Sequence, residues 1–192
     1  MPVLCIALAA LSLLCRVGAP SLGSLSVEPV AYAVAPDLCS FDVFLTVPNN
    51  CSTYAVFGDP NDELYVPPAY QYGLPFGTSV GSPDPVFFAQ APLLVLDSFL
   101  TIGDEDARTI TSVGLSWDDW TATTPLRTSN GAVFMIDPQM GPRGKIRVAR
   151  LTVAATSIVQ LSFQGALHAL TGSVVWRLPR QRASLLCSGT GH

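Results

Sequence analysis

The chain has 192 residues, of which 49% are hydrophobic and only 12% charged. This composition excludes an intrinsically disordered chain, and the net charge of −4 argues against a nucleic-acid-binding protein. No apolar run reaches the roughly 18 to 20 residues that a membrane-spanning helix needs, so no transmembrane helix is expected. The length fits one compact domain.

Charge is distributed unevenly along the chain. All fourteen acidic residues lie between Glu28 and Asp137, a stretch whose only basic residues are Arg108 and Arg127. From Pro138 onward there are seven basic residues and no acidic one. The two halves of such a chain can pair within one molecule or head to tail between copies. We favour a folded domain that neutralises its own surface.

The first residues have the pattern of a secretory signal peptide. Val3–Cys15 is an apolar run of 13 residues, followed by Arg16 and the small-residue stretch Val17-Gly18-Ala19. A short apolar segment before a small-residue cleavage zone is typical of such signals. We expect a signal peptide over residues 1–19, with Gly23 as the alternative cleavage region, and a secreted protein. A buried N-terminal helix is the competing interpretation.

Removal of that segment leaves Cys39, Cys51 and Cys187, an odd number in an oxidising compartment. One thiol is therefore left over or pairs with another chain. A hairpin turning at residues 48–50 would place Cys39 and Cys51 at different heights, too far apart to bridge. We therefore favour a Cys39–Cys187 disulfide. Asn50-Cys51-Ser52 also matches the acceptor pattern for N-glycosylation, so a glycan is expected on Asn50.

The rest of the chain has the pattern of an all-β protein. Short runs rich in Val, Ile, Thr, Phe and Leu alternate with turn residues, which favours a β-sandwich or barrel. We predict a β-sandwich of roughly nine or ten antiparallel strands over residues 38–178, after a lead-in strand in residues 20–37 and before a mobile basic tail, residues 179–192. The predicted strands are residues 30–34, 41–47, 54–57, 64–66, 95–102, 110–117, 132–136, 146–153, 158–163 and 173–178.

Two local features qualify this pattern. In the strand 146–153, the apolar residues share one face only if an extra residue sits near Ala149-Arg150, which predicts a β-bulge. Residues 67–92 contain six prolines, three glycines and five aromatic residues. Such a segment cannot form a regular central strand, so we predict a long ordered loop or flap.

Aromatic residues supply the first candidate ligand site. Trp117 and Trp120 flank two aspartates, and the Pro-rich loop adds Tyr70 and Tyr72. Aromatic rings beside carboxylates suit the C–H faces and hydroxyl groups of a carbohydrate. The competing interpretation, that these rings pack against the domain, is the one we favour.

Acidic residues supply the second candidate site. Asp59, Asn61 and Glu63 have the spacing of the first three ligands of an EF-hand loop. However, Leu64 occupies the position that needs glycine and Tyr70 the position of the bidentate glutamate. The pattern therefore excludes an EF-hand. A looser calcium site between loops of the sandwich is one interpretation of these residues, and solvated turns that bind no ion are the other.

No motif marks a catalytic centre. The sequence has no nucleophile elbow and no paired Cys or His spacing for zinc, so we expect neither an enzyme nor a cofactor other than calcium. A glycosidase that uses Asp118 and Asp119 as acid and base is the enzymatic alternative.

Three segments resemble known modules. Tyr54-Ala55-Val56-Phe57-Gly58-Asp59, Asp97-Ser98-Phe99-Leu100-Thr101-Ile102-Gly103 and Asn130-Gly131-Ala132-Val133-Phe134 look like recurring blocks of β-rich modules in large secreted or surface proteins of marine algae and bacteria. The resemblance covers about residues 38 to 165 and implies an extracellular module without an active site. The basic tail and the single copy depart from that pattern.

These observations lead to one expected function and one alternative. We expect a secreted, non-enzymatic structural or adhesive component of a cell surface or extracellular matrix, which assembles with other extracellular proteins or with itself. The alternative is a carbohydrate-binding module assisted by calcium.

Overall fold

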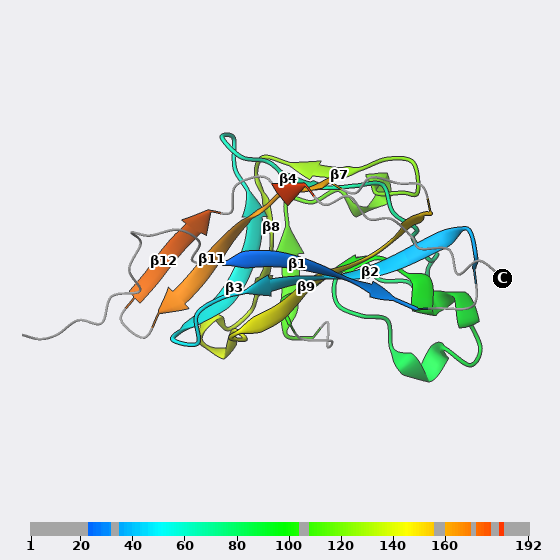
Figure 1. Ribbon diagram of the computed structural model, residues 1–192, viewed down its shortest axis with the longest axis horizontal. Coiled ribbons are helices and arrows are strands. Elements are labelled where there is room, and N and C mark those ends of the chain that lie inside the picture. Colours follow the sequence, from blue (N-terminus) through cyan, green and yellow to red (C-terminus); the bar gives the residue numbers. More distant parts are fainter. Residues whose placement is uncertain are drawn as a thin grey trace, which may run out of the picture.

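The computed structural model describes residues 23–31, 35–103, 108–155, 160–169, 172–177 and 181–182. These residues form the predicted all-β sandwich, with two larger antiparallel sheets (Figure 1). The predicted signal peptide and Cys187 lie outside the described residues, as does the predicted tail apart from residues 181–182. In the described part of the chain, no helix is long and apolar enough to cross a membrane.

The first sheet has four strands, in the order β1 (Ser24–Val30), β2 (Leu38–Thr46), β9 (Lys145–Ala154) and β5 (Phe99–Leu100). Its centre is the β2–β9 pair, in which Phe41, Val43 and Leu45 of β2 are at most 3% exposed. This alternation of apolar and polar residues gives the sheet one face toward the core and one toward solvent. β1 forms an edge, and no residue of it is fully buried.

The second sheet has five strands, in the order β12 (Gly172–Arg177), β11 (Gln164–Ala169), β3 (Cys51–Gly58), β8 (Gly131–Met135) and β6 (Ile110–Val113). Two short strand pairs accompany the sheets, namely β4 (Leu64–Val66) with β7 (Leu126–Thr128), and β10 (Gln160–Leu161) with β13 (Gln181–Arg182). β7, β11 and β13 were not predicted, and β13 falls within the segment expected to be a tail.

The predicted hairpin between β2 and β3 is wrong, because the two strands belong to different sheets. Thr46 at the end of β2 pairs with Lys145 of β9, whereas Cys51 at the start of β3 pairs with Ala169 of β11. The intervening turn is closed by the Cys51 N–H, which donates to the Pro48 carbonyl. Both strands supply buried apolar residues, so the chain crosses from one sheet to the other and encloses the core between them.

The predicted β-bulge in β9 is confirmed. Val43 pairs with Ala149 and Phe44 pairs with Arg147, so Val148 is the extra residue. Val148 and Ala149 are both buried. The bulge lets Ile146 and Leu151 face the same core although five positions separate them, as the apolar pattern of the strand requires.

The predicted strands 30–34 and 158–163 share only Val30 with β1 and only Gln160–Leu161 with β10. Two further predicted strands are shorter than expected. Within residues 95–102, only Phe99–Leu100 pair as β5, because the 3₁₀ helix η2 (Pro92–Leu96) occupies the preceding residues. Within residues 110–117, β6 ends at Val113, since Gly114 has φ +66°. A Cβ atom on Gly114 would also lie 2.1 Å from the Asn130 carbonyl oxygen, so the turn there needs glycine.

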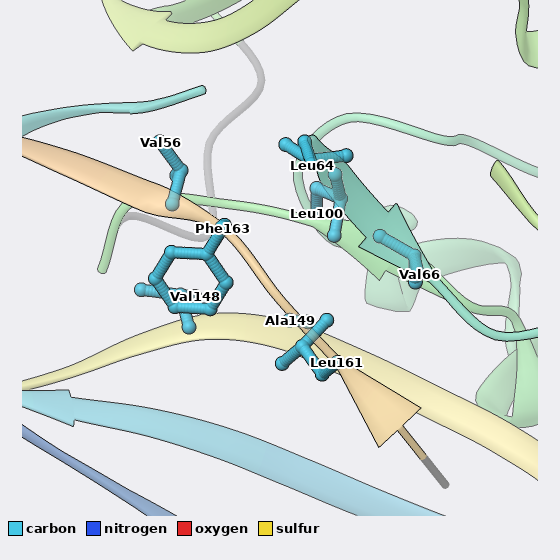
Figure 2. Close-up of a pocket in the computed structure, with 8 residues that line it drawn as sticks. All are labelled: Val56, Leu64, Val66, Leu100, Val148, Ala149, Leu161 and Phe163. Carbon is cyan, nitrogen blue, oxygen red and sulfur yellow. The ribbon is translucent and has the colours of Figure 1, made fainter. Parts of the chain in front are cut away.

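The core lies between the two larger sheets and is closely packed. Figure 2 shows apolar side chains from β3, β4, β5, β9 and β10 that surround a cavity of about 10 Å³. A space of this size holds one water molecule at most, so it is a packing gap rather than a ligand site. Its lining residues are Val56, Leu64, Val66, Leu100, Val148, Ala149, Leu161 and Phe163.

Candidate functional site

The Pro-rich segment, residues 67–92, is an ordered loop held in place by the buried carboxylate of Asp97. The Tyr72 N–H donates to Oδ1 and the Thr78 N–H donates to Oδ2, each at 2.7 Å. Asp97 is 1% exposed. Burial raises the pKa of Asp97 to about 6, although backbone N–H groups that stabilise the carboxylate act in the opposite direction.

The loop is also attached to the first sheet. Val80 forms a parallel bridge with Leu100 of β5, and the Gly81 N–H donates to the Leu100 carbonyl at 2.9 Å. At the start of the loop, the Tyr70 N–H donates to the Thr152 carbonyl of β9 at 2.7 Å. The prediction of a long ordered loop rather than a central strand is therefore confirmed.

Of the two predicted tryptophans, Trp120 supports this loop from inside the molecule. Its indole Nε1–H donates to the Pro67 carbonyl at 2.9 Å, and the residue is 2% exposed. The Trp117 ring is half-buried, with its centroid 6.1 Å from that of Trp120, and its Nε1–H donates to Ser112 Oγ at 3.0 Å. Burial removes Trp120 from contact with a ligand, as the packing interpretation predicted.

Tyr70 lines a surface groove of about 440 Å³. The groove lies between the start of the Pro-rich loop, the turn at residues 122–123 and the end of β9, and none of its lining residues is charged. Those residues are Leu38, Pro67, Pro68, Ala69, Tyr70, Ala122, Thr123, Thr152, Val153 and Ala154. Neither Tyr72 nor the two tryptophans line it, so the predicted aromatic residues do not form one binding site.

A second part of the loop exposes apolar side chains. Leu74 is 91% exposed and Val86, in the 3₁₀ helix η1 (Pro85–Phe87), is 66% exposed. The rings of Phe76 and Phe87 lie 4.8 Å apart between centroids and so hold these two turns together. We call Leu74, Phe76, Val86 and Phe87 the apolar tip. Residues 67–83 include no charged side chain.

The predicted calcium ligands lie in a tight turn. Asp59 Oδ1 accepts hydrogen bonds from the N–H groups of Asn61 and Asp62 at 2.8 and 2.9 Å, and Glu63 is exposed. The carboxylate therefore already closes the turn through backbone donors. Among the described residues, no group of three or more His, Cys, Asp or Glu side chains could hold a metal ion. The calcium site stays a prediction.

The predicted modification sites lie at opposite ends of β2. Cys39 pairs with Val153 near the end of β9, while Cys51 follows the turn after Thr46. The seven residue steps from Cys39 to Thr46 span about 23 Å, so β2 separates the two cysteines along its length, which argues against a direct bridge between them. Asn50 is exposed in the turn, as its predicted glycosylation requires. The Cys39–Cys187 disulfide and the glycan stay predictions.

Charged residues on the outer face of the four-stranded sheet pair with one another. Arg150 Nε and Nη2 donate to the two carboxylate oxygens of Asp42 at 2.9 and 2.8 Å, and Arg147 Nη1 lies 3.4 Å from the same carboxylate. Lys145 pairs with Glu28 of the edge strand. The acidic and basic halves of the chain therefore meet within one molecule at these pairs.

The outer face of the five-stranded sheet has a different chemistry. On β8, Val133 and Met135 face the core, so Ala132 and Phe134 point outward. The strand register places outward residues of β3, β6 and β11 beside them. We call this surface, together with the residue after β8, the apolar face. Its accessible members are Phe57, Val113, Ala132, Phe134 and Ile136, and its base includes Ala55 and Ala166, which are 7% and 5% exposed. Thr111 and the buried Gln164 lie on the same side of the sheet.

Sequence reasoning missed two of these features, the role of Asp97 and the apolar face. A signal for Asp97 exists, because it is the only charged residue in the apolar segment 91–103, and a buried acid needs nearby donors. The apolar face has no local signal, since its members come from strands far apart in the sequence.

Comparison with known proteins identifies no match for this chain among protein-family models, curated proteins or solved structures.

Proposed function

We propose that this protein is a secreted, non-enzymatic structural or adhesive component of a cell surface or extracellular matrix, and that it acts through protein–protein assembly. The resemblance to β-rich modules of secreted and surface proteins belongs to the same proposal. Secretion, the Asn50 glycan and the Cys39–Cys187 disulfide are parts of it that the experiments below test together.

The apolar tip is the observation that carries this proposal. Leu74 and Val86 are large apolar side chains at 91% and 66% exposure, on a loop fixed by the buried Asp97. A rigid apolar projection loses little conformational entropy when a partner covers it, so it is suited to contact with another macromolecule.

The first experiment tests the extracellular location. The full-length chain is expressed in a eukaryotic secretory host, and the intact mass is measured with and without reduction and glycosidase. We expect a product in the medium that is shortened near residues 19–23, carries a glycan on Asn50 and contains a disulfide. An unprocessed product that stays inside the cell with reduced thiols would overturn the proposal.

The second experiment tests the tip as a contact surface. Binding of the secreted chain to immobilised collagen, fibronectin and laminin is measured by biolayer interferometry. We expect binding by the wild type, at least a tenfold weaker response for the double variant Leu74→Ser, Val86→Ser, and no change for Met140→Ser. Met140 is a matched control, because it is 72% exposed but lies outside the tip. Equal binding by all three proteins contradicts a role for the tip.

Carbohydrate binding is the second candidate function, and the groove beside Tyr70 favours it. The groove has an aromatic ring, the polar residues Thr123 and Thr152, and no charge, which suits a neutral sugar. Isothermal titration with neutral oligosaccharides tests it. We expect micromolar to millimolar affinity that is lost in Tyr70→Ala, and a broad panel without any heat of binding would exclude this function.

A further inference from the structure

We propose that the apolar face is the contact between two copies of this chain. The inference rests on the proposed function and deepens it, because it names the chain itself as one assembly partner. Val113 and Ile136, at the margin of the face, are 60% and 63% exposed. Val113 pairs with Ala132 and Ile136 lies four residues farther along the chain from Ala132, so the two mark opposite ends of the face. Large apolar side chains at this exposure favour burial against a second surface.

The shape of the face suits another sheet. Register places Ala132 beside both Phe57 and Val113, and Ala55 between Phe134 and Ala166. Ala132 therefore lies between two larger side chains, and Phe134 lies beside a row of two alanines, Ala55 and Ala166. Such a surface allows the side chains of a second sheet to interdigitate at the usual spacing of about 10 Å between packed sheets.

The charge of the molecule points to the same surface. Each copy carries a net charge of −4, so two copies repel each other where acidic groups meet. The outward residues of β3, β6, β8 and β11 include no Asp, Glu, Lys or Arg, and Arg177 of β12 pairs with Gln164 at the edge of the face. A two-fold contact places the same patch on both partners, and an uncharged patch meets itself without repulsion. The outer face of the other sheet would instead bring ion pairs out of water.

The size of the face predicts a weak dimer. The four strands that contribute to the face, β6, β8, β3 and β11, span about 14 Å, and a five-residue strand spans about 17 Å. This footprint is smaller than the roughly 800 Å² that each partner buries in a standard interface. We therefore expect a dissociation constant in the micromolar range.

Pairing through this face leaves the apolar tip accessible. In Figure 1, η1 and η2 lie at the end of the molecule away from β11 and β12, beyond the four-stranded sheet. A dimer formed through the apolar face would thus present two copies of the tip. Two linked copies of a weak contact bind more tightly than one, which an adhesive protein requires.

Sedimentation velocity of the full chain purified from the medium, between about 1 and 200 µM, tests the inference. We expect the wild type to change from monomer to dimer within this range. The variant Val113→Glu, Ile136→Glu should remain monomeric, because the face would then bring four like charges together. The matched control Leu74→Glu, Val86→Glu adds the same charges at exposed positions of the tip and should dimerise like the wild type.

A charge-exchange experiment separates this face from any other contact. The variant Val113→Lys, Ile136→Lys should also be monomeric alone, while a mixture of the Glu and Lys variants should form a heterodimer. A wild type that stays monomeric at every concentration, or a Glu variant that dimerises normally, overturns the inference. Neither result contradicts the proposed function if the chain is secreted and its tip binds other proteins. Failure of the dimer inference can therefore be distinguished from failure of the proposed function.

Discussion

Asp97 illustrates how a single residue determines the course of a long loop. Residues 67–92 contain too many prolines to form a sheet ladder, so their backbone groups need other partners. Asp97 supplies two acceptor oxygens, one for the Tyr72 N–H and one for the Thr78 N–H. The buried charge has an energetic cost, which appears as the raised pKa of about 6.

This cost predicts a pH-dependent stability. The folded-state pKa of Asp97 lies above its usual value of 3.8, so the folded protein binds this proton more tightly than the unfolded chain does. The free energy of unfolding therefore falls as the pH rises from about 4 to 6, by up to about 3 kcal/mol. In Asp97→Asn, which cannot ionise, this contribution is absent. Urea denaturation of both proteins at pH 4, 5, 6 and 7 should show the variant gaining stability relative to the wild type as the pH rises.

The asparagine variant also has one acceptor oxygen fewer for the two amides. At pH 4, where the wild-type carboxyl is protonated, we expect the variant to be less stable by about 1 kcal/mol. A stability difference that stays constant from pH 4 to pH 7 would contradict the burial of an ionised Asp97.

At the scale of elements, prediction from sequence succeeded where the signal was local. The bulge in β9 follows from the break in alternation between Val148 and Leu151, which one strand contains by itself. The assignment of β2 and β3 to different sheets depends on partners about a hundred residues away, and no local pattern specifies it. β11 was missed because Gln164, Gly165 and Ala166 lack the branched side chains typical of a strand, although packing buries all three.

The same limit applies to the candidate site. Local composition identified the Pro-rich loop as ordered and its tyrosines as candidates for binding. It did not reveal that Trp120 would be enclosed beneath Pro67, since this depends on how the loop folds back over the end of the sheet. The sequence indicated that the acidic and basic halves of the chain can pair within one molecule. It did not identify which residues pair, because the register of β2 and β9 brings Asp42 and Arg150 together.

The β2–β9 pair gives a prediction at this scale. Asp42 is 9% exposed and accepts two hydrogen bonds from Arg150, so Asp42→Asn removes a largely buried charge partner. We expect a loss of about 3 kcal/mol in the free energy of unfolding, measured by urea denaturation. Glu28→Gln is the matched control, because the Glu28–Lys145 pair is about half exposed and should contribute less than about 1 kcal/mol. Equal effects of the two substitutions would show that burial does not distinguish these pairs.

At the scale of the whole molecule, the sandwich separates two kinds of surface. The outer face of the four-stranded sheet carries ion pairs that join the acidic and basic halves of the chain. The apolar face and the apolar tip have no charged member, and the exposed carboxylate of Asp84 lies beside the tip, where it accepts a hydrogen bond from the Val86 N–H. Part of the uneven charge of the sequence is therefore neutralised within one sheet, and the apolar surfaces remain for contact with other molecules.

This separation predicts how self-association responds to salt. If two copies meet through the apolar face, raising NaCl from 50 mM to 1 M screens the repulsion between acidic molecules and leaves the contact itself intact. The dissociation constant measured by sedimentation velocity should then stay unchanged or decrease. Head-to-tail pairing of acidic and basic regions predicts the reverse, because the same salt screens attraction between unlike charges. An increase in the dissociation constant of tenfold or more at 1 M NaCl would therefore favour electrostatic assembly over the apolar face.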